Sequence, residues 1–181
     1  MAREITLPEA KPALEWVNGR VLQKVSPKRQ HAVAQGRFYA ALDEWASKGG
    51  LGIVGTEWRF RVQPPGERRR PLVPDVAYLS YARLPFETQQ VTDEPKVAPD
   101  AVVEVLSPRD RRADVEEKMR VYLAAGTGVI FLVDPKRKLV RVRDLRGERT
   151  VREDGVVTHD SLSGFTLEAR RLFSVPPPAA Q

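Results

Sequence analysis

Apolar and polar residues follow two different periods along this chain, and each period predicts one kind of element. Spacings of three and four residues indicate a long helix that begins with Ser26 as its N-cap, ends near Ser47 and is followed by Gly49-Gly50. Similar signals predict further helices at 7–14, 111–125 and 165–173. Alternating or continuous apolar runs predict strands at 15–17, 20–25, 51–54, 56–62, 72–79, 101–106, 129–133 and 139–144, with a weaker pair around Thr150 and Val156.

The arrangement of these elements predicts the fold class. Asn18-Gly19 between two strand-like segments indicates a hairpin with a type I′ turn. The run 129–133 lacks alternation, which is typical of a strand inside a sheet that is covered on both faces. Helix, strands, helix and strand in this order predict a layered α/β or α+β fold. We expect one domain at 1–175 and a disordered proline-rich tail at 176–181.

Two connections between the predicted elements differ in character. Residues 64–71 form a polar loop, whereas residues 80–98 form a long, proline-marked connection. Structureless connections of that length are unusual in a compact domain. We therefore interpret 80–98 as a functional or mobile segment.

Composition narrows the chemistry that is available. The 181 residues include no cysteine and only His31 and His159, which excludes disulfides, thiolate zinc sites, cysteine nucleophiles and multi-histidine metal sites. Any metal should therefore be bound through oxygen, which favours Mg²⁺ or Mn²⁺ over zinc.

Charge and hydropathy indicate which partners to expect. No apolar run approaches the roughly 18 residues of a membrane span, and the N-terminus has no apolar signal core, so we expect a cytoplasmic protein without a membrane partner. The net charge of +6 suits a polyanion such as nucleic acid. An ordinary basic surface, or a heat-adapted composition, explains the same charge.

Two acids stand where apolar residues would be expected. Asp75 lies near the start of the strand at 72–79, and Glu104 lies inside the run 101–106, where period two places it on one face with Val102 and Leu106. A buried carboxylate costs several kcal/mol unless a cation or hydrogen-bond donors balance it. If the two strands are neighbours, Asp75 and Glu104 can converge on one divalent metal. Asp75 as a turn residue and Glu104 as a buried acid paired with an arginine remain open alternatives.

The helix that follows Glu104 adds a candidate cation. Asp114, Lys118 and Tyr122 are spaced by four residues and therefore share a face. Lys118 can extend over the acids, or it can be an exposed lysine that pairs with Asp114. Asp114 and Tyr122 are candidate accessory groups. Three further residues are accessory candidates with structural roles as alternatives: Glu15, His31 and Asp100.

Arginines are concentrated in the predicted strand 56–62 and in the loop that follows it. A segment so rich in arginine suits contact with nucleic-acid phosphates, which arginine binds through two parallel hydrogen bonds. A charged edge strand that resists aggregation has the same composition. The candidate nucleic-acid contacts are Arg59, Arg61, Arg68, Arg69 and Arg70.

Several of these motifs together resemble a known family. The segments PDVAYL (74–79), PDAVVEVLSP (99–108) and GVIFLVDP (128–135), with the D-x-x-x-K-x-x-x-Y pattern that starts at Asp114, resemble the Uma-two family of restriction endonucleases within the PD-(D/E)xK nuclease superfamily. LEWVNGR (14–20), the His31 region and SGFTLEARRLF (163–173) also fit, so the resemblance covers nearly the whole chain.

The resemblance implies a restriction-endonuclease-like mixed central sheet flanked by helices, with an N-terminal hairpin. It also implies that Asp75 and Glu104 bind magnesium and that a lysine assists. The superfamily places this lysine two residues after the glutamate, where this chain has Leu106. The resemblance therefore implies that the lysine has migrated to the next helix, at Lys118.

Three functions follow from these observations. The leading hypothesis is a magnesium-dependent endonuclease that hydrolyses phosphodiester bonds of DNA, and a homodimer is expected because nucleases that cut both strands are commonly dimers. The alternative is a catalytically inactive nucleic-acid-binding module on the same scaffold. A structural or interaction protein, whose acids are only hydrogen-bonded, is the third.

Overall fold

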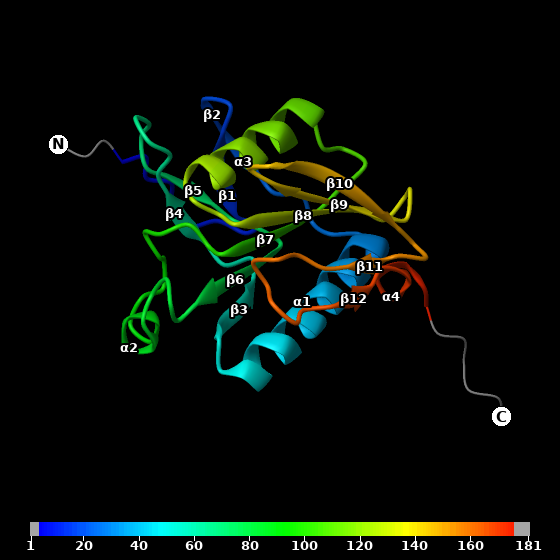
Figure 1. Cartoon of the computed structure of the whole chain (residues 1–181). Coiled ribbons are helices and arrows are strands. Elements are labelled where there is room, and N and C mark those ends of the chain that lie inside the picture. Colours follow the sequence, from blue (N-terminus) through cyan, green and yellow to red (C-terminus); the bar gives the residue numbers. More distant parts are fainter. Residues whose placement is uncertain (1–3, 176–181) are drawn as a thin grey trace.

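A mixed sheet forms the centre of the molecule, whose computed structural model describes residues 4–175 (Figure 1). The strands of this sheet are β3 (Gly52–Thr56), β6 (Val76–Ser80), β7 (Ala101–Val105), β8 (Val129–Asp134), β9 (Leu139–Asp144) and β10 (Gly147–Arg152). Their spatial order is β10-β9-β8-β7-β6-β3, in which only β7 and β8 are parallel neighbours. The predicted mixed α+β fold is confirmed.

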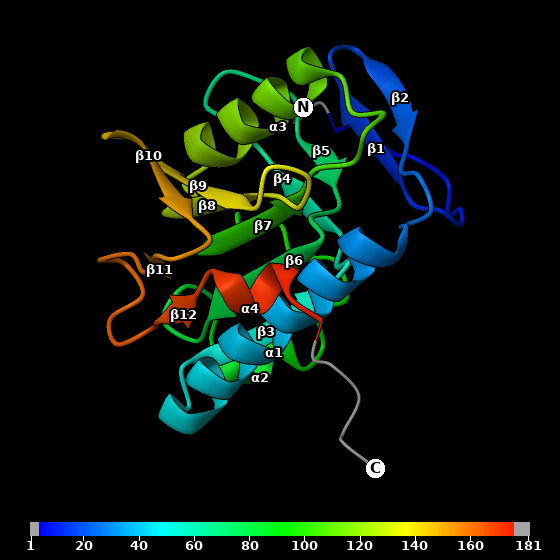
Figure 2. The same ribbon diagram turned by 90° about the vertical axis from the view of Figure 1, so that its right-hand side faces the viewer.

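Helices cover the two faces of the sheet (Figure 2). α1 (Arg29–Gly49) and α4 (Arg170–Phe173) lie on one face, where Phe38, Phe131 and Phe165 pack with ring centroids 5.1 to 6.2 Å apart. α3 (Arg112–Ala124) covers the other face. β8 is buried along its whole length because it has a helix layer on each side, as its continuous apolar run predicted.

Short strand pairs and one short helix extend this core. These elements are β1 (Leu14–Val17) with β2 (Arg20–Gln23), β4 (Phe60–Val62) with β5 (Arg70–Leu72), β11 (Val156–Val157) with β12 (Leu167–Glu168), and α2 (Phe86–Gln89). The β1–β2 hairpin lies beside the start of α3 in Figures 1 and 2. Its turn residues Asn18 and Gly19 have φ angles of 49° and 73°, as the predicted turn requires.

The pairing of β6 with β7 brings the two candidate acids together. The strands are antiparallel, with Val76 opposite Val103. Continuing this register by one pair places Asp75, which directly precedes β6, opposite Glu104. Val102 packs in the core beneath α3, whereas Val103 packs in the core beneath α1. Glu104 therefore lies on the α3 face, as its period-two position predicted.

Two helix predictions are wrong at the N-terminal side of the chain. Residues 7–14 form no helix, which is consistent with Pro8 and Pro12 in that segment. α1 begins at Arg29, with extended Lys28 as its N-cap, instead of at Ser26. Two residues before Ser26, Lys24 donates to the Val73 carbonyl and to Asp75, and the helix begins only after Lys28.

Several strand boundaries also differ from the prediction. The segment 56–62 is interrupted at Glu57, whose φ is 50° and whose N–H donates to the Asp75 carbonyl. The segment 72–79 divides in the same place, so Asp75 occupies a bend between β5 and β6. β5 lies partly within the predicted loop 64–71, α2 lies within 80–98, and β12 replaces the start of the helix expected at 165–173. The predicted tail 176–181 lies outside the described residues.

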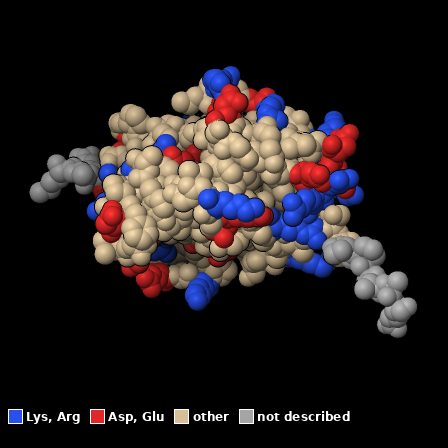
Figure 3. Space-filling view, turned by 60° about the horizontal axis from the view of Figure 1, so that its bottom comes forward, with Lys and Arg blue, Asp and Glu red and all other residues tan. Residues whose placement is uncertain are grey.

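Surface charge is mixed on the face seen in Figure 3, which looks up at the molecule from below the view of Figure 1. Basic and acidic side chains lie beside each other along its margins and again near its centre, and the areas between these groups carry neither. The surplus of positive charge therefore does not make this face uniformly basic. Among the described residues, no helix has the length and apolar character needed to cross a membrane.

Candidate active site

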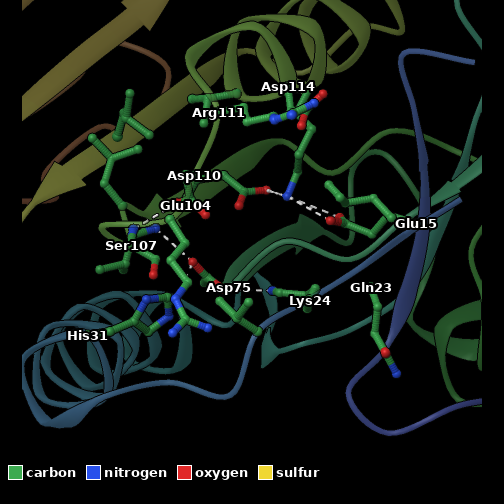
Figure 4. A pocket seen from close by; sticks show the side chains of 18 of the residues that line it. Glu15, Gln23, Lys24, His31, Asp75, Glu104, Ser107, Asp110, Arg111 and Asp114 are labelled. Carbon is green, nitrogen blue, oxygen red and sulfur yellow. Dashed lines mark hydrogen bonds and ion pairs between the residues drawn. The ribbon is translucent and has the colours of Figure 1, made fainter. Parts of the chain in front are cut away.

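A cavity of about 270 Å³ opens where the β1–β2 hairpin, the start of α1 and the segment between β7 and α3 meet. Asp75 and Glu104 line it, and their side chains approach from neighbouring strands (Figure 4). Glu15, Lys24 and His31 reach the same space from the hairpin and from α1. The antiparallel β6–β7 pair thus supplies two acids to a pocket whose walls come from distant parts of the chain.

Asp75 is balanced by cations and by one backbone donor. It is 2% exposed, and its Oδ1 lies 2.6 Å from Lys24 Nζ. Its Oδ2 lies 3.5 Å from His31 Nε2 and accepts the N–H of Val105 at 2.7 Å. Burial raises the pKa of Asp75, but Lys24 and His31 outweigh that effect and hold the pKa well below its usual range. Asp75 is therefore an anion at neutral pH.

The pKa of Glu104 is shifted in the opposite direction. Glu104 is 9% exposed, and burial raises its pKa to about 7 even though Lys118 opposes the shift. Lys118 Nζ lies 2.6 Å from Glu104 Oε1 and 3.0 Å from Glu15 Oε1. Glu15 also accepts the Val73 N–H at 2.8 Å, which ties β1 to the segment before Asp75.

Lys118 remains an ammonium ion in this environment. Burial lowers its pKa, but the carboxylates of Glu104, Glu15 and Asp75 raise it by more, so the net shift is upward. Lys118 is only 8% exposed, and the alternative of a solvated lysine paired with Asp114 is wrong. Two contacts occupy Asp114 instead: Arg20 at 2.6 Å and Asn18 at 2.7 Å, which fasten the β1–β2 hairpin to α3.

Two accessory candidates lie outside this cavity. Tyr122 is fully buried beneath the site, and its hydroxyl has no hydrogen-bond partner among residues 4–175. Burial raises the pKa of Tyr122 well above its usual value. Asp100 lies at the other end of β7, where it accepts the Ser80 N–H and pairs with Arg83. The structure therefore brings Glu15 and His31 to Asp75 and Glu104, but not Asp100.

The predicted arginine cluster does not line the cavity. Most of its members are occupied by carboxylates of the same chain. Arg59 pairs with Glu94, Arg61 with Glu4 and Glu94, and Arg70 with Glu67 and Glu117, while Arg69 donates to the carbonyls of Arg61 and Lys96. Arg68 is exposed. These contacts give Arg59, Arg61 and Arg70 a structural role that neither interpretation of the sequence had assigned to them.

Sequence reasoning missed Lys24, which contacts Asp75 more closely than any other cation. The available signal was the alternation of β2. Arg20 and Leu22 lie on its inner side, and Leu22 packs against the core beneath α3. Period two places Lys24 on that same side. A lysine in phase with a partly buried leucine indicates a charge that points toward the core and needs an acid.

The donor chemistry of the cavity fits a hard divalent cation. Glu104 Oε1 is buried and accepts no well-directed hydrogen bond, although Lys118 Nζ lies nearby. In residues 4–175 no three Asp, Glu or His side chains are arranged to hold a metal ion. Mg²⁺ in nucleotide-processing sites is commonly held by one or two carboxylates, together with water and phosphate oxygens. Asp75 and Glu104 fit such a cation.

Comparison with known proteins identifies the family of the chain. The model of the Uma2 family, described as "Putative restriction endonuclease", matches residues 4–170. The chain belongs to the Uma2 family. The resemblance inferred from the sequence motifs is therefore confirmed.

A solved structure supports the same conclusion for this Uma2 protein. It is a protein from Anabaena variabilis described as a putative nuclease belonging to DUF820, and it shares 26% sequence identity with this chain. The TM-score is 0.81, and the match covers 92% of this chain and 93% of the other. No curated protein matches the chain. Family and neighbour together support nuclease activity in general.

Proposed function

We propose that this Uma2 protein is a metal-dependent endonuclease that hydrolyses phosphodiester bonds of DNA. One observation carries the proposal: Asp75 and Glu104 face one cavity from adjacent antiparallel strands, and the buried ammonium of Lys118 lies 2.6 Å from Glu104. Two acids and a lysine in this arrangement match what the nuclease superfamily requires, although the lysine comes from α3.

Asp75 and Glu104 would hold Mg²⁺ or Mn²⁺. A divalent cation bound there would lower the pKa of an attacking water and offset negative charge on the phosphate. Lys24 now contacts Asp75 Oδ1, so its ammonium has to move aside when that oxygen binds a cation. Lys24 is next to the cavity and can then pair with a phosphate oxygen.

Lys118 would act on the phosphate or on the attacking water. Glu15 and Glu104 fix its ammonium from two sides, so little conformational entropy is lost when it donates a hydrogen bond to the reacting group. The upward shift of its pKa keeps this donor protonated at neutral pH. A positive donor at this position stabilises the negative charge that accumulates on the phosphate oxygens as water attacks.

The decisive experiment compares acid variants on supercoiled plasmid, with and without Mg²⁺ or Mn²⁺. Glu104→Ala and the volume-conserving Glu104→Gln should each reduce cleavage by more than about 100-fold, because even the outer-shell partners of a metal contribute 10- to 100-fold. The control variant Glu153→Ala removes an acid that does not line this cavity, and it should cleave at the wild-type rate. Retained cleavage in both Glu104 variants, with the fold checked by thermal melting, would refute the proposal.

Metal titration by calorimetry separates the proposed enzyme from the alternative function. The wild type should bind Mn²⁺ or Mg²⁺, and Glu104→Gln should bind it more weakly. Binding of DNA without any metal binding or cleavage would favour the inactive nucleic-acid-binding module. The homodimer and the cytoplasmic location stay predictions.

A further inference from the structure

Two arginines line the same cavity from the segment that joins β7 to α3. Arg109 and Arg111 are exposed, and no ion pair or side-chain hydrogen bond of either guanidinium is found within residues 4–175. Arg59, Arg61 and Arg70 are instead paired with acids. Of the three arginines that line the cavity within residues 4–175, Arg20 is paired with Asp114, so Arg109 and Arg111 are the two without an acid partner.

The local backbone holds these two arginines in a defined place. Asp110 accepts the N–H of Ser107 at 2.7 Å, and its own N–H donates to the Ser107 carbonyl at 3.1 Å. This turn follows directly on Leu106, whose N–H is bonded to Val133 in the neighbouring strand. The segment between Glu104 and Lys118 is thus anchored at the end of the sheet.

Charge is distributed within the cavity in a way that suits one chemical class of ligand. The floor carries Asp75 and Glu104, which suit a metal cation, whereas Arg109 and Arg111 lie at exposed positions of the wall. Asp110 also lines the cavity, but the turn engages its carboxylate. A single free phosphate would need only a metal ion held by Asp75 and Glu104. A polymer of phosphodiesters offers one phosphate to the floor and further phosphates to cations outside it.

We propose that Arg109 and Arg111 bind the phosphates that flank the scissile phosphodiester. The proposal rests on the nuclease function proposed above. It assigns contact with the nucleic-acid backbone to the β7–α3 segment instead of to the arginines of the β4–β5 region. Guanidinium groups bind phosphate oxygens through two parallel hydrogen bonds, and such contacts position a nucleic acid without reading its sequence.

The test measures binding rather than cleavage. Affinity of the full chain for a short fluorescent DNA duplex, and for RNA of the same sequence, is measured by anisotropy in EDTA over a range of salt concentrations. The variant Arg109→Ala/Arg111→Ala is compared with Arg68→Ala/Arg112→Ala, which removes the same charge from exposed positions that do not line the cavity. Thermal melts check that all proteins are folded.

Each phosphate contact contributes about 0.9 to the slope of log affinity against log salt on duplex DNA. Arg109→Ala/Arg111→Ala should therefore lower the slope by about 2, whereas the control variant should keep the wild-type slope. This difference on either polymer supports the proposal, and the polymer that binds identifies the source of the phosphates.

Equal slopes in the two variants would overturn the proposal while leaving the nuclease function to the Glu104 experiment. A wild type that binds neither polymer and cleaves no plasmid would overturn both. Plasmid cleavage that depends on Glu104, together with equal slopes, would overturn only the assignment of Arg109 and Arg111.

Discussion

The chain contains two Pro-Asp pairs, and the structure gives them the same local geometry at opposite ends of β6 and β7. Asp75 precedes β6, and Asp100 precedes β7. Because these strands are antiparallel, each aspartate lies beside the end of the other strand. Asp75 accepts the Val105 N–H at 2.7 Å, and Asp100 accepts the Ser80 N–H at 2.7 Å. Asp75 with the end of β7 forms one corner of the β6–β7 pair, and Asp100 with the end of β6 forms the other. In both corners the aspartate accepts a hydrogen bond from a backbone N–H that would otherwise lack a partner.

The two corners differ in the residue that faces the aspartate. The β6–β7 register places Glu104 opposite Asp75 and Leu79 opposite Asp100. Leu79 is fully buried on the same α3 face. A Pro-Asp pair at a strand start is therefore a structural device in this fold, and it joins a candidate active site only where a second acid stands across from it. Glu104 rather than Asp75 distinguishes the two corners.

The largest expected effect comes from copying Glu104 into the other corner. Leu79→Glu loses a fully buried apolar side chain and buries a second acid opposite Asp100, which already pairs with Arg83. We expect the free energy of unfolding to fall by about 5 kcal/mol, measured by urea denaturation. Leu79→Met should cost less than about 1.5 kcal/mol, because it nearly conserves volume. A Leu79→Glu variant as stable as Leu79→Met would show that either corner accepts an acid.

Removing Lys118 should make the buried acid in the Asp75 corner destabilising as well. Lys118→Met leaves Glu104 and Glu15 buried without their shared cation. We expect a loss of about 3 kcal/mol in the free energy of unfolding, the usual cost of a broken buried pair. Adding Glu104→Gln should recover part of that loss, and urea denaturation of both single variants and the double variant measures the coupling. Strictly additive losses would mean that Lys118 does not stabilise Glu104.

Sequence reasoning located Glu104 because its signal is local. Period two and the apolar run 101–106 are enough to place this acid on one face of a buried strand. The face shared by Asp114 and Lys118 follows from helical spacing in the same way. The Uma2 resemblance, rather than composition or spacing, linked these residues to a nuclease.

The partners of these residues could not be predicted from local patterns. Glu15 meets Lys118 across 103 positions of the chain, and Lys24 meets Asp75 across 51. The arginines at 59 and 61 looked available for phosphate because their partner, Glu94, lies more than 30 residues away. Pairing of this kind depends on how the hairpins pack, which no periodicity encodes.

The two aspartates themselves should differ modestly in their structural value. Asp75→Ala and Asp100→Ala each remove the acceptor of a strand-end N–H. Each variant should lose about 1–3 kcal/mol of stability by urea denaturation. Asp75→Ala should lie at the upper end, because it also leaves Lys24 buried without its acid, whereas Arg83 is partly exposed and also donates to carbonyls. A larger loss for Asp100→Ala would reverse this ordering.

The smallest expected effect is a dependence of stability on pH that only the Glu104 corner produces. The pKa of Glu104 rises from an ordinary value of 4.5 to about 7 in the folded protein, chiefly through burial. Below pH 4.5 the carboxyl is protonated in both folded and unfolded chains. Between pH 4.5 and 7 the folded protein binds more protons, so stability falls as pH rises and then levels off.

Comparison with Glu104→Gln isolates this contribution. The pKa of Asp75 is depressed in the folded protein, so Asp75 contributes stability that is lost only at lower pH. This contribution is the same in both proteins. Between pH 5 and 7 the wild type should lose about 2 kcal/mol relative to Glu104→Gln in urea denaturation, because the unfolded chain releases the Glu104 proton about two pH units earlier than the folded protein does. Parallel stability curves for the two proteins would mean that Glu104 titrates as an exposed acid does, and the contrast between the two Pro-Asp corners would then lose its electrostatic basis.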